Sequence, residues 1–274
     1  MISPNWKRLD QDSLDRRTDE VFKSIGGFSW FQLFISTCYV LYNKSVMLVI
    51  LSLSYLEKVP TEYVCSYESQ PGVETACKPA DFCKDSTVLS YRADVEHKNY
   101  YENWVSKFDL TCASNTKMGF IASSYFIGWI ITLLFLPRLS DLYGRHKIIS
   151  NGNVIQVLAY TYLLYAPSYV GLIASMLVLG MMATVRTQVS VVYFYESMTK
   201  QNYTLMYATM AMLEGFIGLT AALYFQYISK NWFWLIFFGY VAQVFGTIGS
   251  FLFPESPRYL IKTGQIKRAQ KVFE

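Results

Sequence analysis

The sequence contains few charged side chains and almost no histidine. Of its 274 residues, 16% are Asp, Glu, Lys or Arg, while 53% are hydrophobic and 17% aromatic, an unusual balance for a water-exposed protein. The two histidines, His97 and His146, both fall in expected loops. No Ser/His/Asp or Cys/His set, phosphate-binding loop or metal-ligand cluster is recognisable. The sequence therefore predicts neither an enzyme, nor a cofactor, nor a metal site.

No cleavable signal peptide is expected from residues 1–27 either, because this segment is polar and charged. We expect part of this segment to form a short helix lying on the inner membrane surface, with a disordered tail as the alternative. The Pro-x-Asp/Glu-x-x-Lys/Arg signature that follows the odd-numbered helices of mitochondrial carriers is missing as well. Its absence argues against that family.

Long apolar runs, by contrast, are abundant. Each is close to the ~20 residues that an α-helix needs to cross ~30 Å of hydrocarbon. Six runs are expected to be transmembrane helices: 28–56, 118–136, 148–166, 171–195, 203–227 and 232–253. These runs predict an all-α membrane protein, built as a six-transmembrane-helix bundle, rather than a large soluble protein with buried helices.

Basic side chains are concentrated on one side of the expected membrane. They occur in residues 1–27, in the turn after the second run and in residues 254–274, whereas the short turns of the opposite side carry almost none. By the positive-inside rule both termini are cytosolic, and residues 254–274 begin a cytosolic linker. The net charge of +4 thus reflects membrane topology and does not indicate a nucleic-acid partner.

The polar segment 57–117 holds four of the five cysteines: Cys65, Cys77, Cys83 and Cys112. An even number of cysteines in an extracytosolic loop predicts two disulfides, whose three possible pairings the sequence does not separate. A zinc site is the alternative, although paired Cys-x-x-Cys spacing is lacking. We expect this loop to be a small stapled domain over the outer end of helices 118–253.

Several motifs occur together along the chain. They are Asp141-Leu-Tyr-Gly144-Arg145 between the second and third runs, Gly180 and Glu196 around the fourth, and Pro254-Glu-Ser-Pro-Arg258 after the sixth. With the long cysteine-bearing loop, this combination resembles the organic ion transporter family of the major facilitator superfamily. The resemblance implies the N-terminal half of that fold, in which substrate binds between two six-helix halves and crosses by alternating access.

The same resemblance implies a location, partners and a gate. The expected location is the plasma membrane, with a mitochondrial or other organelle membrane as the alternative. The expected partners are membrane lipid, a small organic ion substrate, and the missing C-terminal six-helix half or a membrane complex. The cytosolic gate, where ion pairs hold the outward-facing state, is expected to comprise Asp141, Gly144, Arg145, Glu196 and Arg258.

Three ionisable residues fall inside the runs, where a charge costs ~3 kcal/mol or more and is expected to face a partner, water or the interior. Arg186 and Glu214 lie at similar depths, so we expect them to pair, either as a fixed link between two helices or along the substrate path. Lys44 either faces the interior or extends toward the outer surface. The candidates for the substrate path are Asn43, Lys44, Arg186, Glu214, Tyr193 and Tyr224.

Four positions depart from the pattern of the family: Pro137, Leu142, Arg186 and Tyr203. On the cytosolic face, Pro137 stands where the family has a glycine, and Leu142 and Tyr203 stand where it has arginines. These departures keep a second hypothesis open, in which the chain is a degenerate half-carrier acting as a structural accessory subunit of a larger membrane complex.

Overall fold

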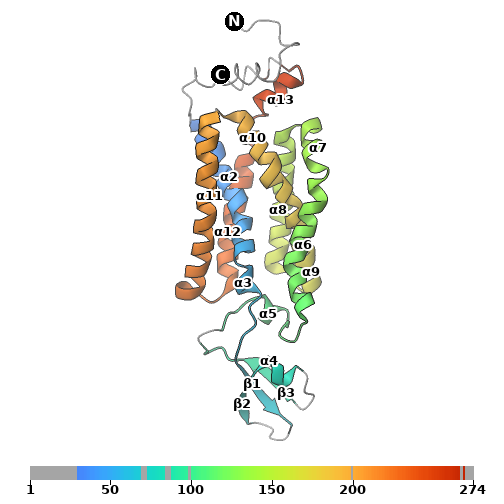
Figure 1. Ribbon diagram of the computed structural model, residues 1–274, viewed down its shortest axis with the longest axis vertical. Helices are drawn as coiled ribbons and strands as arrows, with labels where there is room; N and C mark the ends of the chain where they lie inside the picture. The colour runs from blue at the N-terminus through green and yellow to red at the C-terminus, as the bar shows by residue number, and fades with distance from the viewer. Residues whose placement is uncertain are drawn as a thin grey trace.

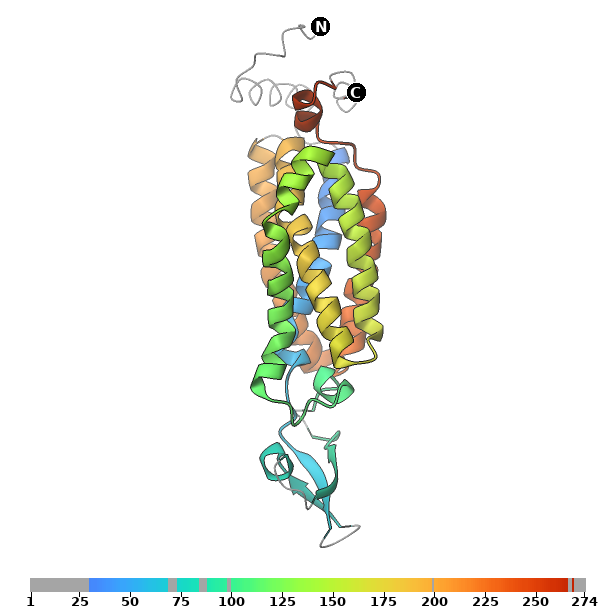
Figure 2. The same cartoon turned by 90° about the vertical axis from the view of Figure 1, so that its right-hand side faces the viewer.

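The computed structural model of the protein describes residues 30–68, 73–83, 88–97, 100–198, 200–265 and 268; the expected surface helix within residues 1–27 lies outside them. Long helices lie side by side in an elongated bundle (Figure 1). A small β-sheet domain lies beyond one end of the bundle, and helix α13 (Pro257–Lys262) lies beyond the other (Figure 2). The helical bundle expected from the apolar runs is therefore present.

The bundle helices coincide closely with the apolar runs. They are α2 (Trp30–Leu51), α6 (Asn115–Leu133), α8 (Arg145–Tyr165), α9 (Tyr169–Thr184), α11 (Lys200–Leu223) and α12 (Trp232–Ser250). Helix α9 continues through the π-helical turn η2 (Val185–Val189) into α10 (Ser190–Ser197), and α11 ends in a second π-helical turn, η3 (Tyr224–Ile228). The first run is interrupted at Ser52, after which the short helix α3 (Leu53–Leu56) follows.

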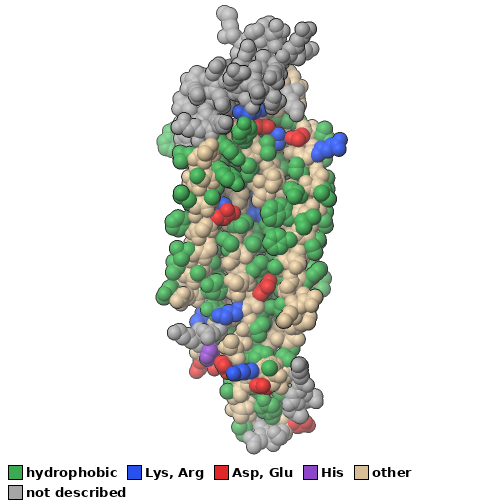
Figure 3. All heavy atoms as spheres, viewed as in Figure 1, with side chains coloured by type: hydrophobic (Ala, Val, Ile, Leu, Met, Phe, Trp, Pro, Cys, Tyr) green, Lys and Arg blue, Asp and Glu red, His purple; other side chains and the backbone are tan. Residues whose placement is uncertain are grey.

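Four of the described helices are long and apolar enough to cross a membrane, namely α2, α9 with its continuation, α11 with η3, and α12; the bent pair α6–α7 would add a fifth. Helix α8 is more polar, because it begins Arg145-His-Lys147 and also carries Asn153 and Gln156. That the chain crosses the membrane six times therefore stays a prediction. Charged side chains gather toward the ends of the molecule, and hydrophobic ones cover much of the length between them (Figure 3).

The basic segment after the second run, expected to be a loop, is mostly helical. Helix α7 (Leu136–Tyr143) is bent by 46° from α6, and Pro137 lies in its first turn, where its missing N–H costs no helical hydrogen bond. Gly144 alone separates α7 from α8, with a φ of 101° that glycine adopts readily. The expected loop is thus corrected to a helix–glycine–helix corner.

Helices α6 and α9 cross at very close range. A Cβ atom on Gly128 would overlap the backbone of α9, and one on Gly180 would overlap the backbone of α6. Small residues at a crossing allow membrane helices to approach in this way. The hydroxyls of Thr132 and Thr184 lie 2.8 Å apart at the same crossing. The two helices are thus held by direct backbone contact and by hydrogen bonds.

The segment between α3 and α6 contains a three-stranded antiparallel sheet. Its order is β2 (Glu74–Cys77), β1 (Tyr63–Tyr67), β3 (Val88–Ala93), with helix α4 (Pro79–Phe82) after β2. One disulfide, Cys65–Cys77, joins β1 to β2, and the other, Cys83–Cys112, joins the end of α4 to the approach to α6. The two expected disulfides are confirmed, and these cysteines are not zinc ligands.

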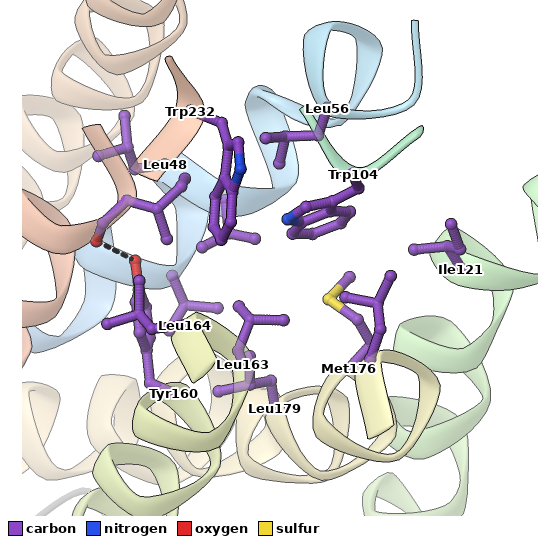
Figure 4. Close-up of a cluster of buried hydrophobic side chains, with 14 of the residues drawn as sticks. Leu48, Leu56, Trp104, Ile121, Tyr160, Leu163, Leu164, Met176, Leu179 and Trp232 are labelled. Carbon is purple, nitrogen blue, oxygen red and sulfur yellow. Dashed lines mark hydrogen bonds between the residues drawn. The ribbon is translucent and has the colours of Figure 1, made fainter. Parts of the chain in front are cut away.

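Helix α5 (Trp104–Lys107) attaches the sheet domain to the bundle. The side chain of Asn103 caps this helix and donates to two carbonyl oxygens of the α3 segment, at 2.9 and 2.7 Å. Trp104 is fully buried and contacts Trp232 edge to face, with ring centroids 6.0 Å apart. Figure 4 shows both rings within the cluster of buried side chains. The sheet domain is therefore anchored by side chains inserted into the core.

Candidate functional site

An ion pair joins α2 to α11 near the middle of their lengths. Lys44 Nζ lies 3.3 Å from Glu214 Oε1, and their side chains are 9% and 44% exposed, respectively. Of the two orientations left open by the sequence, Lys44 therefore adopts the inward one. Glu214 is only partly covered by the described residues, so it remains accessible from the face that α11 presents.

Arg186 is fully buried in the π-helical turn η2. It donates from Nη1 to Asn43 O at 3.2 Å and from Nη2 to Tyr125 Oη at 2.8 Å, while Asn43 Nδ2 donates back to Arg186 O at 3.4 Å. Its Nε has no hydrogen-bond partner among the described residues. The guanidinium group is therefore held by neutral groups and has no carboxylate partner in the described structure.

The expected pair between Arg186 and Glu214 is wrong. Their similar depth, counted along each helix, gives no information about the direction in which each side chain leaves its helix. Helix α11 packs along α2, where Ser36 Oγ approaches Met206 Sδ at 3.1 Å, and Glu214 consequently meets Lys44. We call Lys44, Arg186 and Glu214 the central group. Its two positive charges exceed its single negative charge by one.

Two polar side chains of α8, Asn153 and Gln156, lie at the level of Arg186. Neither is among the candidates expected from the sequence. A Cβ atom on Gly152 would lie 2.7 Å from a methyl group of Val185, so this part of α8 lies directly against the turn that carries Arg186. Asn153 and Gln156 are both fully buried there, and Gln156 Nε2 donates to Tyr42 O at 3.2 Å. Polar residues inside an apolar run are the sequence signal that would have identified them.

The two tyrosines expected along the substrate path lie elsewhere. Tyr193 donates to Pro254 O at 2.9 Å and stacks on Phe253, with centroids 5.7 Å apart, near the end of α12. Tyr224 donates to Asn231 O at 2.9 Å, at the other end of that helix. The structure thus brings together four of the six candidates, and neither tyrosine contacts them through a hydrogen bond.

A second candidate site, here called the end cluster, lies at the end of the bundle near α13. Arg145 Nε and Nη2 donate to the Glu196 carboxylate at 2.6 and 2.8 Å, and Nη2 lies 3.1 Å from Asp141 Oδ1. The Arg145 and Glu196 side chains are 12% and 13% exposed. This bidentate contact, a strong type of charged hydrogen bond, joins the α7–α8 corner to α10.

Glu255 completes the corner, although it is absent from the gate residues expected from the sequence. Its Oε1 accepts from the backbone N–H groups of Arg145 and His146 at 3.0 and 3.1 Å, at the positive N-terminal end of α8. Gly144 leaves room for this contact, since a Cβ atom there would overlap the carboxylate. The motif around Glu255 indicates an important segment, but its spacing does not reveal which member reaches α8.

Ser256 and Arg258 connect the same segment to α10. Ser256 Oγ donates to Glu196 Oε2 at 2.5 Å, and the Arg258 guanidinium lies 4.8 Å from the centre of the Tyr195 ring. All five expected gate residues therefore lie within or beside one cluster, which Glu255 and Ser256 complete. Separating the α7–α8 corner from α10 requires several of these contacts to break together.

At the opposite end, Glu57 follows α3 at the junction with the sheet domain. Burial raises the pKa of Glu57 from 4.5 to about 7, and its Oε1 has no hydrogen-bond partner among the described residues. The folded state then binds the proton more tightly than the unfolded chain. The contribution of Glu57 to the free energy of unfolding is therefore fully present below pH 4.5, and it is lost as the pH rises to about 7.

We expect Glu57→Gln to remove this decline, so that its thermal midpoint, relative to wild type, improves steadily between pH 4.5 and about 7. Thermal unfolding of the purified protein across that range measures the difference. Glu96→Gln, an exposed acid of the same domain, is the matched control. A difference between Glu57→Gln and wild type that is independent of pH contradicts the expectation.

Residues 70–274 match the family model described as "Sugar (and other) transporter". The chain belongs to this family. Among similar proteins, a solute carrier family 22 member 15-like protein of Xenopus laevis is 25% identical over 260 residues, which are 93% of this chain and 49% of that protein. A D-xylose transporter of Levilactobacillus brevis is 23% identical over 161 residues, 58% of this chain and 35% of its own. Solute carrier family 22 member 2 of Rattus norvegicus is 22% identical over 170 residues, covering 62% and 30%.

As a member of the sugar (and other) transporter family, and so of the major facilitator superfamily, the chain is an integral membrane protein. The resemblance to organic ion transporters is confirmed by the solute carrier family 22 relatives, and the extent of the chain fits the N-terminal portion of such a protein. The chain spans about half the length of the first of these relatives, and less of the others.

Proposed function

We propose that this chain is the N-terminal six-helix half of a secondary carrier that moves small organic ions or related solutes by alternating access. The observation that carries the proposal is the group of three ionisable side chains, Lys44, Arg186 and Glu214, near the middle of the length of an apolar bundle, with Lys44 and Arg186 buried. Charges at such depth are costly and occur mainly along the pathways of substrates and ions. The protein would perform no covalent chemistry.

The end cluster supports the same mechanism by providing a gate. Ion pairs that form in one conformation and break in the other bias a two-state equilibrium, and we assign this role to the contacts of Arg145 with Glu196 and Asp141. In this proposal the end cluster and both termini are cytosolic, and the protein resides in the plasma membrane. A C-terminal half would cover the apolar side chains that α11 leaves exposed, among them Leu205, Met212 and Phe216.

Arg186→Met tests the proposal by separating stability from transport. The variant removes a buried charge that lacks a carboxylate partner, so we expect the folded protein to be as stable as wild type or more stable. We expect uptake by the full-length protein to fall at least tenfold, because the central group loses its excess positive charge. Thermal unfolding and initial uptake rates of labelled organic anions, organic cations and sugars in proteoliposomes measure the two effects.

Arg138→Met, a substitution of an exposed arginine on α7, is the matched control and is expected to leave uptake unchanged. Wild-type uptake by Arg186→Met would remove Arg186 from the path. A full-length protein that transports none of the panel and purifies within a larger membrane assembly would instead favour the structural-subunit hypothesis.

A further inference from the structure

A pocket of about 360 Å³ lies beside the end cluster, between the first turn of α8 and the segment that includes α13. Its basic lining side chains are His146, Lys147 and Arg268. The hydroxyl group of Tyr143 adds a hydrogen-bond donor to the wall, whereas the amide oxygen of Gln265 accepts from Arg268 Nη1 at 3.0 Å. The pocket thus combines cationic and polar groups in one concave surface.

The acid among these lining residues, Glu255, is already engaged. Its Oε1 accepts from the backbone N–H groups of Arg145, His146 and Ser256, at 3.0, 3.1 and 3.1 Å. Lys147 and Arg268, in contrast, form no ion pair within the described part of the chain. With His146 counted as neutral, the two positive charges of Lys147 and Arg268 exceed the single negative charge of Glu255 by one.

The position of the pocket connects it to the membrane surface. Leu142 and Tyr143, which end α7 beside it, are 67% and 63% exposed, and Tyr259 donates to Leu142 O at 3.1 Å, which fixes this part of the wall. Exposed apolar side chains next to basic groups at the end of an apolar bundle are typical of the boundary between hydrocarbon and headgroups. A ligand in this pocket would therefore be reachable both from the lipid and from water.

We propose that this pocket binds a phosphate monoester group, whose oxygens are held by Lys147 and Arg268. A guanidinium group recognises phosphate through paired N–H groups, and a lysine ammonium adds a compact charge. Two sources present the same group: the headgroup of phosphatidic acid and a soluble molecule that carries a phosphate monoester. Neither source requires the central group or the transport mechanism, so the site stands independently of them.

Binding of two probes to the purified full-length protein in detergent tests the proposal: short-chain phosphatidic acid and inorganic phosphate, each measured by isothermal titration calorimetry. The double variant Lys147→Gln/Arg268→Gln is expected to weaken binding at least tenfold. Arg138→Gln, which removes an arginine of the same end of the bundle outside the pocket lining, is the matched control and is expected to bind as wild type. An unchanged elution volume and thermal midpoint confirm that each variant is folded.

If both probes bind and the double variant weakens both, the site accepts phosphate from either source. If phosphatidic acid alone binds, and the double variant loses this binding, the source is the lipid. If neither probe binds, or if the double variant binds like wild type, the proposal is overturned. A loss of equal size in Arg138→Gln also overturns it, because the effect would then reflect general charge at this end of the bundle and not the pocket.

Discussion

Replacing Arg145 by glutamine is expected to destabilise the folded protein by about 3–5 kcal/mol, the usual effect of removing one partner from a buried ion pair. Glu196 would keep its contact with Ser256 but lose both charged hydrogen bonds, in a position where its side chain is 13% exposed. Asp141 would lose its ion pair with Arg145 as well, although its greater exposure reduces that loss.

Thermal or denaturant unfolding of the purified protein measures the effect of Arg145→Gln. The double variant Arg145→Gln/Glu196→Gln is expected to recover part of the loss, because it leaves no uncompensated carboxylate at the centre of the cluster. Arg138→Gln, which removes an exposed arginine in the first turn of α7, should change stability little. If Arg145→Gln costs no more than this control, Arg145 does not hold the α7–α8 corner to α10.

Replacing Gly180 by alanine is expected to cost at least ~3 kcal/mol, at or beyond the upper end of ordinary overpacking. The added Cβ atom would overlap the backbone of Tyr125, which cannot rotate away as a flexible side chain can. Helices α6 and α9 would have to separate, and the contact between Thr132 and Thr184 at the same crossing would weaken.

Gly215→Ala on α11 is the matched control for this prediction. No atom lies within 4 Å of a Cβ atom built there, so the same added carbon is expected to stabilise the helix, by up to ~1 kcal/mol. Unfolding midpoints of the two variants should therefore move in opposite directions. Equal shifts would show that the α6–α9 crossing tolerates a side chain at position 180.

The parts of the fold that depend on local pattern are predictable from the sequence. The apolar runs coincide with the bundle helices because helix length and burial in lipid both require long apolar segments. The number of disulfides follows from an even set of cysteines in one loop. The sequence motifs at this end of the bundle contain charged residues and so predict that these residues form ion pairs. Arg145, Asp141 and Glu196 do pair in the end cluster.

Features that depend on how helices rotate and pack are not predictable in this way. Counting residues placed Arg186 and Glu214 at one depth, but the packing of α11 on α2 brings Glu214 to Lys44 instead. The π-helical turn η2 rotates the residues of α9 and α10 relative to a regular helix, which no periodicity in the sequence announces. Similarly, α7 contains Pro137, a residue that usually suggests the end of a helix. It is tolerated here because it occupies the first turn.

The anchoring of the sheet domain has a mechanical consequence. Asn103 and Trp104 fasten that domain to the bundle that the structure describes, and the strands lie well beyond the bundle end (Figure 1). In a rigid body, displacement grows with distance from the pivot. If the bundle tilts, as the proposed alternating access requires, the strands therefore sweep a wider arc than the helices, as the far arm of a lever does, and the outermost part of the molecule amplifies small rotations at the membrane centre.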